Sequence, residues 1–269
     1  MPSNPHSDRD EVADALVGRA QRRGGGVPLR NAFLQQGTQN LPTPGPLHYL
    51  VRNHDERGLD LYLLARSVIS SDEVTEAWDV RLDARVWARG LGLPTPNNDG
   101  AAAVSKVWRR LEDRGLISRQ RQGRLTNITI LDENGRGSDY SYPSGKGKGR
   151  YFKLSEQYWT AEDRWYRTLS LPAKAMLLVA SSLKPGFVLP LEQVPKWYGM
   201  SPDTASDGLG ELEAKGLLEV GKKSRPEPLS PTKYVIENVY TLLGPFAQDW
   251  RTKDDLATVT TLTFNAGSA

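Results

Sequence analysis

Basic side chains gather between residues 106 and 124, and they give the strongest chemical signal in the sequence. This density of positive charge attracts phosphate groups, and an arginine can also donate two hydrogen bonds to the edge of one guanine. Only Glu112 and Asp113 oppose the seven cations of the cluster, which are Lys106, Arg109, Arg110, Arg114, Arg119, Arg121 and Arg124. A charge run can also be an ordinary solvated helix face. The elements that carry these residues therefore decide between the two interpretations.

The first part of the cluster lies on a predicted helix over residues 101–114. Its apolar residues recur at helical spacing and predict a buried face: Val104, Val107, Trp108 and Leu111. The opposite face then holds Ala102, Ser105, Lys106, Arg109, Arg110 and Asp113. Small residues near the helix start would permit close approach to a DNA groove, where the three basic residues would reach guanine edges or phosphates.

The elements around this helix follow a recognisable order. Residues 47–68 predict helical segments interrupted near 55–58, Val80 and Leu82 begin the next unit, and residues 84–91 predict a short helix before turn residues at 95–100. Gly115 is expected to end the longer helix. In residues 118–131, basic or polar side chains alternate with apolar ones around Gly123. This pattern predicts a β-hairpin that carries Arg119, Arg121 and Arg124. Helix, short helix, turn, longer helix and hairpin together are typical of a winged helix.

The second half of the chain repeats this arrangement about 100 residues later. The first predicted elements are an apolar helix over 169–183 with Pro172 in its first turn, a short strand over 187–189, and a short helix over 191–198 stopped by Gly199. A helix over 203–215 follows, with Ser201 as its N-cap and Pro202 at the first helical position. Strands over 217–220 and 234–242, joined by a hairpin tip over 221–232, complete the unit. Gly216-Leu217-Leu218 matches Gly115-Leu116-Ile117 in position and kind. The sequence therefore predicts an α+β fold, mainly helical, with two units in tandem.

Two segments carry a resemblance to known proteins. Residues 108–117 (Trp-Arg-Arg-Leu-Glu-Asp-Arg-Gly-Leu-Ile) and residues 209–218 (Leu-Gly-Glu-Leu-Glu-Ala-Lys-Gly-Leu-Leu) both resemble the recognition helix and first wing strand of winged helix-turn-helix proteins. The tandem arrangement over about residues 47–242 is similar to plasmid replication initiators and to actinobacterial helix-turn-helix regulators. The resemblance implies that recognition-helix and wing residues touch DNA, and it does not choose a target sequence.

The two copies differ in charge. The outward residues of the second helix include Asp203, Asp207, Gly210, Glu211 and Ala214, with Glu213 close by. These carboxylates would repel phosphates in a major groove. The second hairpin carries Lys222, Lys223 and Arg225, which would grip a DNA backbone. We therefore expect the second copy to supply dimerisation, spacing or nonspecific phosphate contact, and the first copy to read sequence.

The rest of the chain is divided by composition. Residues 1–44 predict a flexible tail with a short helix, 45–135 the first unit, 136–160 a basic linker and junction, 161–245 the second unit, and 246–269 a C-terminal tail. The glycine- and lysine-rich run 145–150 lacks the spacing of a nucleotide-binding loop, so a flexible connector is expected, with DNA-backbone contact as the secondary interpretation.

Several function classes find no support in the composition. The chain has no cysteine, and its three histidines, His6, His48 and His54, lack metal-ligand spacing. Tyr140 and Tyr142 lack the paired histidines of a metal-dependent nicking site. No apolar run reaches the roughly 18 residues of a membrane span, and residues 1–30 contain no secretory signal. We therefore expect no enzyme activity, cofactor or metal, and a cytoplasmic, nucleoid-associated location.

The sequence predicts a protein that binds double-stranded DNA sequence-specifically, as a transcription regulator or a plasmid-type replication initiator. The expected DNA-binding residues are Ser105, Lys106, Arg109, Arg110, Arg119, Arg121, Arg124, Lys222, Lys223 and Arg225. A homodimer or a protein partner is expected at the second unit or the N-terminal helix. The alternative is a tandem winged-helix scaffold for protein interactions, of the chromosome- or plasmid-partition type.

Overall fold

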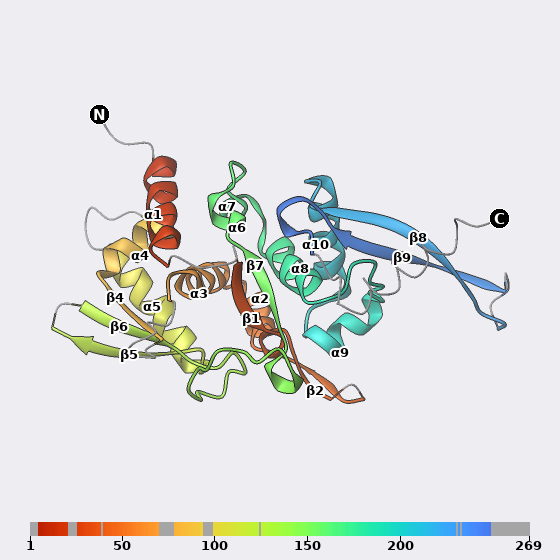
Figure 1. Ribbon diagram of the computed structural model, residues 1–269, viewed down its shortest axis with the longest axis horizontal. Coiled ribbons are helices and arrows are strands. Elements are labelled where there is room, and N and C mark those ends of the chain that lie inside the picture. The colour runs from red at the N-terminus through yellow and green to blue at the C-terminus, as the bar shows by residue number, and fades with distance from the viewer. Residues whose placement is uncertain are drawn as a thin grey trace, which may run out of the picture.

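Two helical units carry β-hairpins that project to opposite ends of the long axis of the molecule (Figure 1). The computed structural model describes residues 5–20, 26–38, 40–69, 78–93, 99–123, 125–229, 231 and 233–248. Small antiparallel sheets accompany the helices, so the α+β class is confirmed.

The first unit spans residues 47–130. Its elements are α2 (Leu47–Arg52), α3 (Glu56–Val68), β4 (Asp79–Leu82), α4 (Ala84–Gly90), α5 (Asp99–Asp113), β5 (Ile117–Gln122) and β6 (Leu125–Ile130). The strands form one antiparallel sheet in the order β4-β6-β5. The predicted apolar face of α5 is buried, and the rings of Trp87 and Trp108 meet edge to face at 5.3 Å. Gly115 adopts φ +64°, so the predicted end of α5 is confirmed.

The second unit spans residues 171–242 and follows the same order. Its elements are α8 (Leu171–Ser181), a 3-10 turn (Leu191–Gln193), α9 (Val194–Tyr198), α10 (Pro202–Ala214), β8 (Leu218–Pro226) and β9 (Tyr234–Leu242). The hydroxyl of Ser201 accepts a hydrogen bond from the Thr204 amide at 3.1 Å, which confirms the predicted cap of α10.

Two strand predictions in this unit need correction. The strand expected over 187–189 is reduced to a single bridge between Phe187 and Tyr240. The strand expected to stop at residue 220 continues to Pro226, because every residue from Leu218 to Pro226 finds a partner on β9. The hairpin is therefore longer, and its tip shorter, than the sequence predicts.

The N-terminal segment packs into the fold. It forms α1 (Pro5–Arg19), β1 (Gly26–Arg30), a 3-10 turn (Asn31–Phe33), β2 (Gln35–Gly37) and β3 (Pro42–Pro44). Val27, Leu29 and Phe33 are buried, and the carboxylate of Asp8 lies 2.5 Å from the guanidinium of Arg89 on α4. The short helix predicted within residues 1–44 is therefore confirmed as α1, whereas the prediction that the segment is a flexible tail is wrong for its described residues. Short apolar strands within a polar, proline-rich segment gave no periodic signal.

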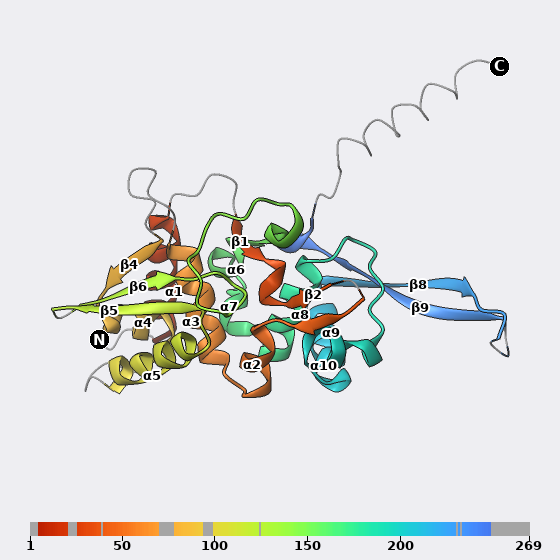
Figure 2. The ribbon, with the colours of Figure 1, turned by 90° about the horizontal axis from the view of Figure 1, so that it is seen from below.

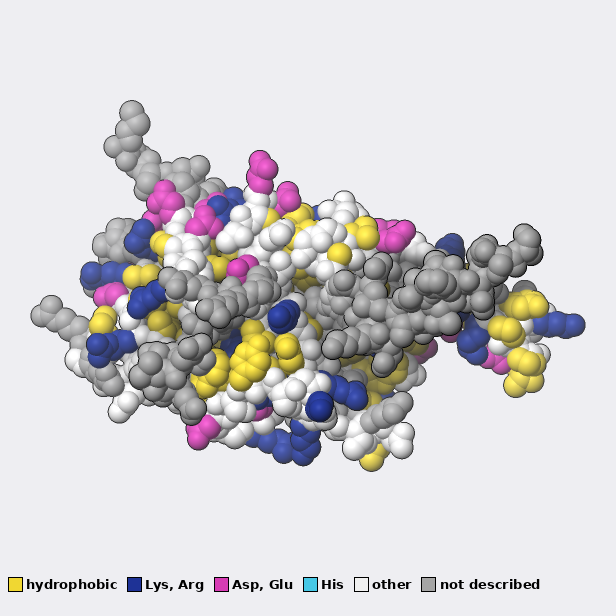
Figure 3. Space-filling model, in the orientation of Figure 1, with side chains coloured by type: hydrophobic (Ala, Val, Ile, Leu, Met, Phe, Trp, Pro, Cys, Tyr) yellow, Lys and Arg dark blue, Asp and Glu magenta, His cyan; other side chains and the backbone are white. Residues whose placement is uncertain are grey.

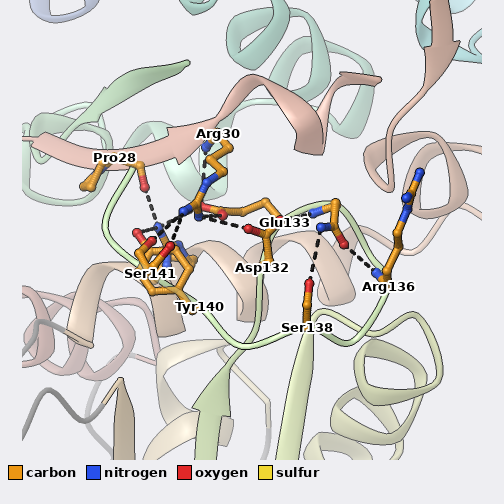
Figure 4. Close-up of polar contacts among 10 residues, drawn as sticks. Pro28, Arg30, Asp132, Glu133, Arg136, Ser138, Tyr140 and Ser141 are labelled. Carbon is orange, nitrogen blue, oxygen red and sulfur yellow. Dashed lines mark hydrogen bonds and ion pairs between the residues drawn. The ribbon is translucent and has the colours of Figure 1, made fainter. Parts of the chain in front are cut away.

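The segment predicted as a flexible linker is also ordered by packing. It pairs with the N-terminal segment, because β7 (Tyr151–Ser155) runs antiparallel to β1. Upstream of β7, the side chain of Glu133 is 0% exposed and lies 2.6 Å from the guanidinium of Arg30 and 2.9 Å from that of Arg66 (Figure 4). We call Arg30, Arg66 and Glu133 the buried arginine pair cluster. It joins β1, α3 and the segment after β6. Further along, the amide of Asn31 donates to the carbonyl of Arg150 at 3.0 Å, so the connector predicted as flexible over 145–150 is tied to the N-terminal segment.

Short helices α6 (Gln157–Thr160) and α7 (Trp165–Thr168) follow β7. Tyr158, Trp159 and Tyr166 are buried there, and the rings of Tyr158 and Trp159 meet edge to face at 4.9 Å. Phe246, in a 3-10 turn over Gly244–Phe246, is also buried, although it falls in the predicted C-terminal tail. The tail from residue 249 onward lies outside the described residues.

A buried lysine joins the two units. Lys174 of α8 is 1% exposed, and its ammonium lies 2.7 Å from the carboxylates of both Glu56 and Asp60 on α3. On the other side of α8, α10 packs closely because Gly208 has no side chain: a Cβ there would meet the carbonyl oxygen of Pro172 at 2.5 Å. These contacts fix α3, α8 and α10 against each other.

The joined units place two helices on one side of the molecule. In Figure 2, α5 and α10 lie along the same lower edge, with α2 between them. Among the described helices, none combines the length and apolar character that a membrane crossing requires.

The Lys174 contact gives a stability prediction. Lys174→Met keeps most of the side-chain volume but leaves the Asp60 carboxylate buried without its ammonium partner. We expect a loss of about 3–5 kcal/mol in the free energy of unfolding, measured by urea denaturation. Arg9, at 3.6 Å, is then the remaining cation beside Asp60 in the described structure. The double variant Lys174→Met/Asp60→Asn removes the buried carboxylate as well and is expected to recover part of the loss. A single variant within about 1 kcal/mol of the parent would show that the ion pair does not join the units.

Candidate nucleic-acid interface

The outward face of α5 presents the predicted small and basic residues to solvent. Ser105, Lys106 and Arg109 are all exposed, and the Ser105 hydroxyl donates to the carbonyl oxygen of Ala101 at 3.0 Å. Neither Lys106 nor Arg109 forms an ion pair with any residue that the structure describes. These two cations are therefore available to an external anion.

Arg110, also predicted to reach DNA, is held by a carboxylate. Its guanidinium donates to Asp55 at 2.6 and 2.9 Å, and Arg114 donates to the same carboxylate at 2.9 Å. Asp55 also caps α3 by accepting from the Gly58 amide at 3.0 Å. Arg110 therefore fixes α5 against the start of α3.

The electrostatics of Asp55 reflect this pairing. Burial favours the neutral carboxyl and raises its pKa, but the hydrogen bonds from Arg110 and Arg114 outweigh burial, so the pKa of Asp55 lies below its ordinary value. Asp55 is thus ionised in the folded protein at neutral pH, and its charge is balanced by the two arginines.

One basic residue of this surface escapes prediction from the sequence. Arg57, exposed in the first turn of α3, lines a hollow of about 360 Å³ together with Lys106 and Arg110 of α5. The sequence places Arg57 about 50 positions before the basic cluster, and only the packing of α3 on α5 brings them together. No local pattern would have found it.

The arginines of the first hairpin differ in whether a carboxylate holds them. Arg119 donates to Glu112 through its side chain at 2.6 and 2.8 Å and through its backbone amide at 2.9 Å. Arg121 is exposed, and within the described part of the chain its side chain donates to the nearby carbonyl of Gly123, at 3.2 Å. Arg124 lies outside the described residues. Arg121 is therefore the described arginine of this hairpin that is best placed to contact an external anion.

The outward face of α10 is acidic as predicted, but one of the carboxylates assigned to it lies elsewhere. Asp203, Asp207 and Glu213 are exposed as predicted. Glu211 instead packs against α8, where it accepts hydrogen bonds from the backbone amide of Ser170 at 3.0 Å and from the Ser170 hydroxyl. Glu211 therefore serves the contact between α8 and α10 rather than the outer surface.

The second hairpin combines basic and apolar side chains, gathered at the right-hand end of the molecule in Figure 3. Lys222 and Lys223 are exposed, whereas Arg225 pairs with Glu237 at 3.2 Å and with Glu227 at 3.1 Å. Leu229 is 94% exposed and Ile236 is 69% exposed. The hairpin thus offers an apolar end and two lysines that form no ion pair with the residues described in the structure.

The arrangement provides no centre for metal chemistry among the residues that the structure describes: no three His, Asp or Glu side chains gather as a metal site there. The chain was compared with protein-family models, curated proteins and solved structures, and no family model, curated protein or solved structure matched it. Conclusions about function therefore depend on the geometry of the surface.

The pairing of Asp55 predicts an acid-sensitive contribution to stability. Asn can still cap α3, so Asp55→Asn removes the ion pairs while keeping the cap. Because the folded pKa lies below the ordinary value of 3.8, the stabilisation by Asp55 is complete above that pH and is lost as the pH falls below it.

Urea denaturation at several pH values between 7 and 3 checks this prediction. The difference in unfolding free energy between the parent and Asp55→Asn is expected to be largest near neutral pH and to shrink below pH 3.8. The exposed Asp113→Asn serves as the matched control on α5 and is expected to have little effect. A difference that does not change with pH would contradict the ion-pair account.

Proposed function

We propose that the chain binds double-stranded DNA and that its two units are winged helix-turn-helix domains in tandem. The repeated order of helix, strand or bridge, short helix, longer helix and hairpin supports this assignment. The sheet order β4-β6-β5, with the first strand beside the last, is also what a winged helix requires. The observation that carries the proposal is the exposed face of α5, where Lys106 and Arg109 have no partner among the described residues.

The dimensions of α5 suit a major groove. Its 15 residues extend about 22 Å at about 1.5 Å per residue, and the major groove is about 12 Å wide. Ser105 would allow close approach, and Arg109 would donate two hydrogen bonds to a guanine. Lys106 and Arg57, on either side of the hollow between α3 and α5, would contact the flanking phosphates.

The first hairpin would act as the wing. Arg121 would contact the adjacent backbone, whereas Arg119 would have to release Glu112 before it reached a phosphate. Arg110 supports the interface by holding α5 in place through Asp55. Sequence reading is thus assigned chiefly to Arg109, with Ser105 allowing the close approach and Lys106 contacting a phosphate.

The second unit would assist without reading sequence. The carboxylates of Asp203 and Asp207 disfavour entry of α10 into a groove, although α10 lies along the same edge as α5 (Figure 2). Lys222 and Lys223 would add contacts to the DNA backbone. Alternatively, the second unit would set the spacing between the two DNA-reading units of a dimer. A transcription regulator would bind one palindrome with this surface, and a plasmid-type replication initiator would bind several repeats with it.

A second candidate function is a scaffold for protein interactions. The exposed apolar residues Leu229 and Ile236 at the end of the second hairpin favour it, together with the acidic face of α10. The unpaired cations of α5 favour DNA binding. In the scaffold proposal the second hairpin would contact protein and the α5 face would contribute no affinity for DNA.

Arg109→Ala tests the DNA proposal. A preferred duplex is first selected from a random pool with the parent protein, and equilibrium binding is then measured by fluorescence anisotropy on that duplex and on a random one. Loss of a guanine contact is expected to cost about 1–3 kcal/mol, or roughly 5- to 150-fold in affinity. The loss should be larger on the selected duplex, because the random duplex is held mainly through phosphates.

Arg19→Ala removes an arginine from α1 and serves as the matched control, with unchanged affinity expected. If the selection enriches no sequence and Arg109→Ala binds as the parent does, the sequence-reading role of α5 is wrong. The scaffold would instead be supported by two results together. The parent protein would show no affinity for DNA, and it would dimerise or capture a protein partner in a way that Ile236→Ser abolishes.

A further inference from the structure

A second basic surface lies apart from α5 and from both hairpins. It surrounds a cavity of about 970 Å³ between the N-terminal segment and the segment that precedes β7. Residues that line it include Asn31, Gln36, Arg136, Tyr142, Lys148 and Arg150. The proposed duplex interface uses none of them.

The cations of this cavity are unbalanced. Arg136, Lys148 and Arg150 are exposed, and their side chains form no ion pair with any residue in the described part of the chain. The carboxylate of Asp132 also lines the cavity, but it lies 3.5 Å from the buried guanidinium of Arg30. Figure 4 shows the side chain of Arg136 pointing away from the buried arginine pair cluster. Three positive charges therefore face one cavity.

The backbone holds these cations in place. The amide of Gly145 donates to the carbonyl of Gly149 at 2.9 Å, and the amide of Asn31 donates to the carbonyl of Arg150 at 3.0 Å. Gly145 adopts φ +77°, which a side chain would strain. The loop over 145–150 is thus closed on itself and tied to the N-terminal segment, so its cations are presented in a defined arrangement.

An exposed aromatic ring lies beside the cations. Tyr142 is 58% exposed, and its ring centroid lies 6.3 Å from that of Tyr151 and 6.4 Å from that of Trp78. These neighbours limit the rotation of the Tyr142 side chain while more than half of its surface remains open. In addition, the side-chain oxygen of Asn31 is buried without a hydrogen-bond partner among the described residues, and it can accept from an N–H group of a base.

We propose that this cavity binds single-stranded nucleic acid, with one base stacked on Tyr142 and neighbouring phosphates on Arg136, Lys148 and Arg150. An aromatic ring beside a row of cations suits this ligand, because every base offers a flat face and every linkage carries a negative charge. A duplex keeps its bases stacked inside and cannot offer one to Tyr142. The proposal is independent of the duplex contacts assigned to α5.

Binding of a labelled twelve-nucleotide oligothymidylate to the full chain tests the proposal, by fluorescence anisotropy at several salt concentrations. Tyr142→Ala is expected to weaken binding roughly 5- to 150-fold, and Tyr142→Phe, which keeps the stacking face, is expected to bind as the parent does. Tyr49→Ala removes an exposed tyrosine outside the cavity and serves as the matched control. Thymidine monophosphate is expected to bind far more weakly, because it offers a single phosphate.

A second variant keeps the test decisive if Tyr142→Ala does not fold. Lys148→Ala/Arg150→Ala should reduce the slope of log K against log salt by about 1.4, since each cation on a single strand contributes about 0.7. The proposal is wrong if the oligonucleotide does not bind, if Tyr142→Ala binds it as the parent does, or if the monophosphate binds equally tightly. It is also wrong if Tyr142→Ala weakens duplex binding by the same factor, since the cavity would then belong to the duplex interface.

Discussion

The ion pairs of Lys174 with Glu56 and Asp60 determine how the two units of this protein are arranged. An ammonium group at 1% exposure is tolerated only with carboxylates at hydrogen-bond distance, and both lie 2.7 Å away. Such pairs add little net stability compared with apolar packing, but a displaced partner leaves a buried charge without compensation. The relative position of α3 and α8 is therefore specified, and with it the edge that α5 and α10 share.

A second buried ionic group extends this framework to the N-terminal segment. Glu133 holds Arg30 of β1 and Arg66 of α3, so the first unit, the N-terminal segment and the segment before β7 form one body. On the surface of that body the arginines divide into two kinds. Arg110 and Arg119 are paired with carboxylates and position elements, whereas Arg109 and Arg136 are unpaired among the described residues and are open to ligands.

The features that the sequence predicts correctly are local ones. Periodic apolar residues such as Val104 and Leu111 identify α5, and Ser201 and Gly115 identify helix ends, because neighbouring residues alone determine these signals. The errors involve contacts between distant residues. Glu133 looks like a solvated linker residue until Arg30 and Arg66 neutralise it, and Arg110 looks free until Asp55 is placed beside it. Charge composition along the chain does not show which charges are paired.

The salt dependence of duplex binding tests the central claim most directly. Six of the cations that face outward without described ion-pair partners are placed to meet a duplex from the α3–α5 surface and the two hairpins: Arg57, Lys106, Arg109, Arg121, Lys222 and Lys223. If all six contact phosphates, log K for a random duplex should fall with log salt at a slope of about −5. Weak binding with a flat salt dependence would contradict the claim that this surface binds DNA.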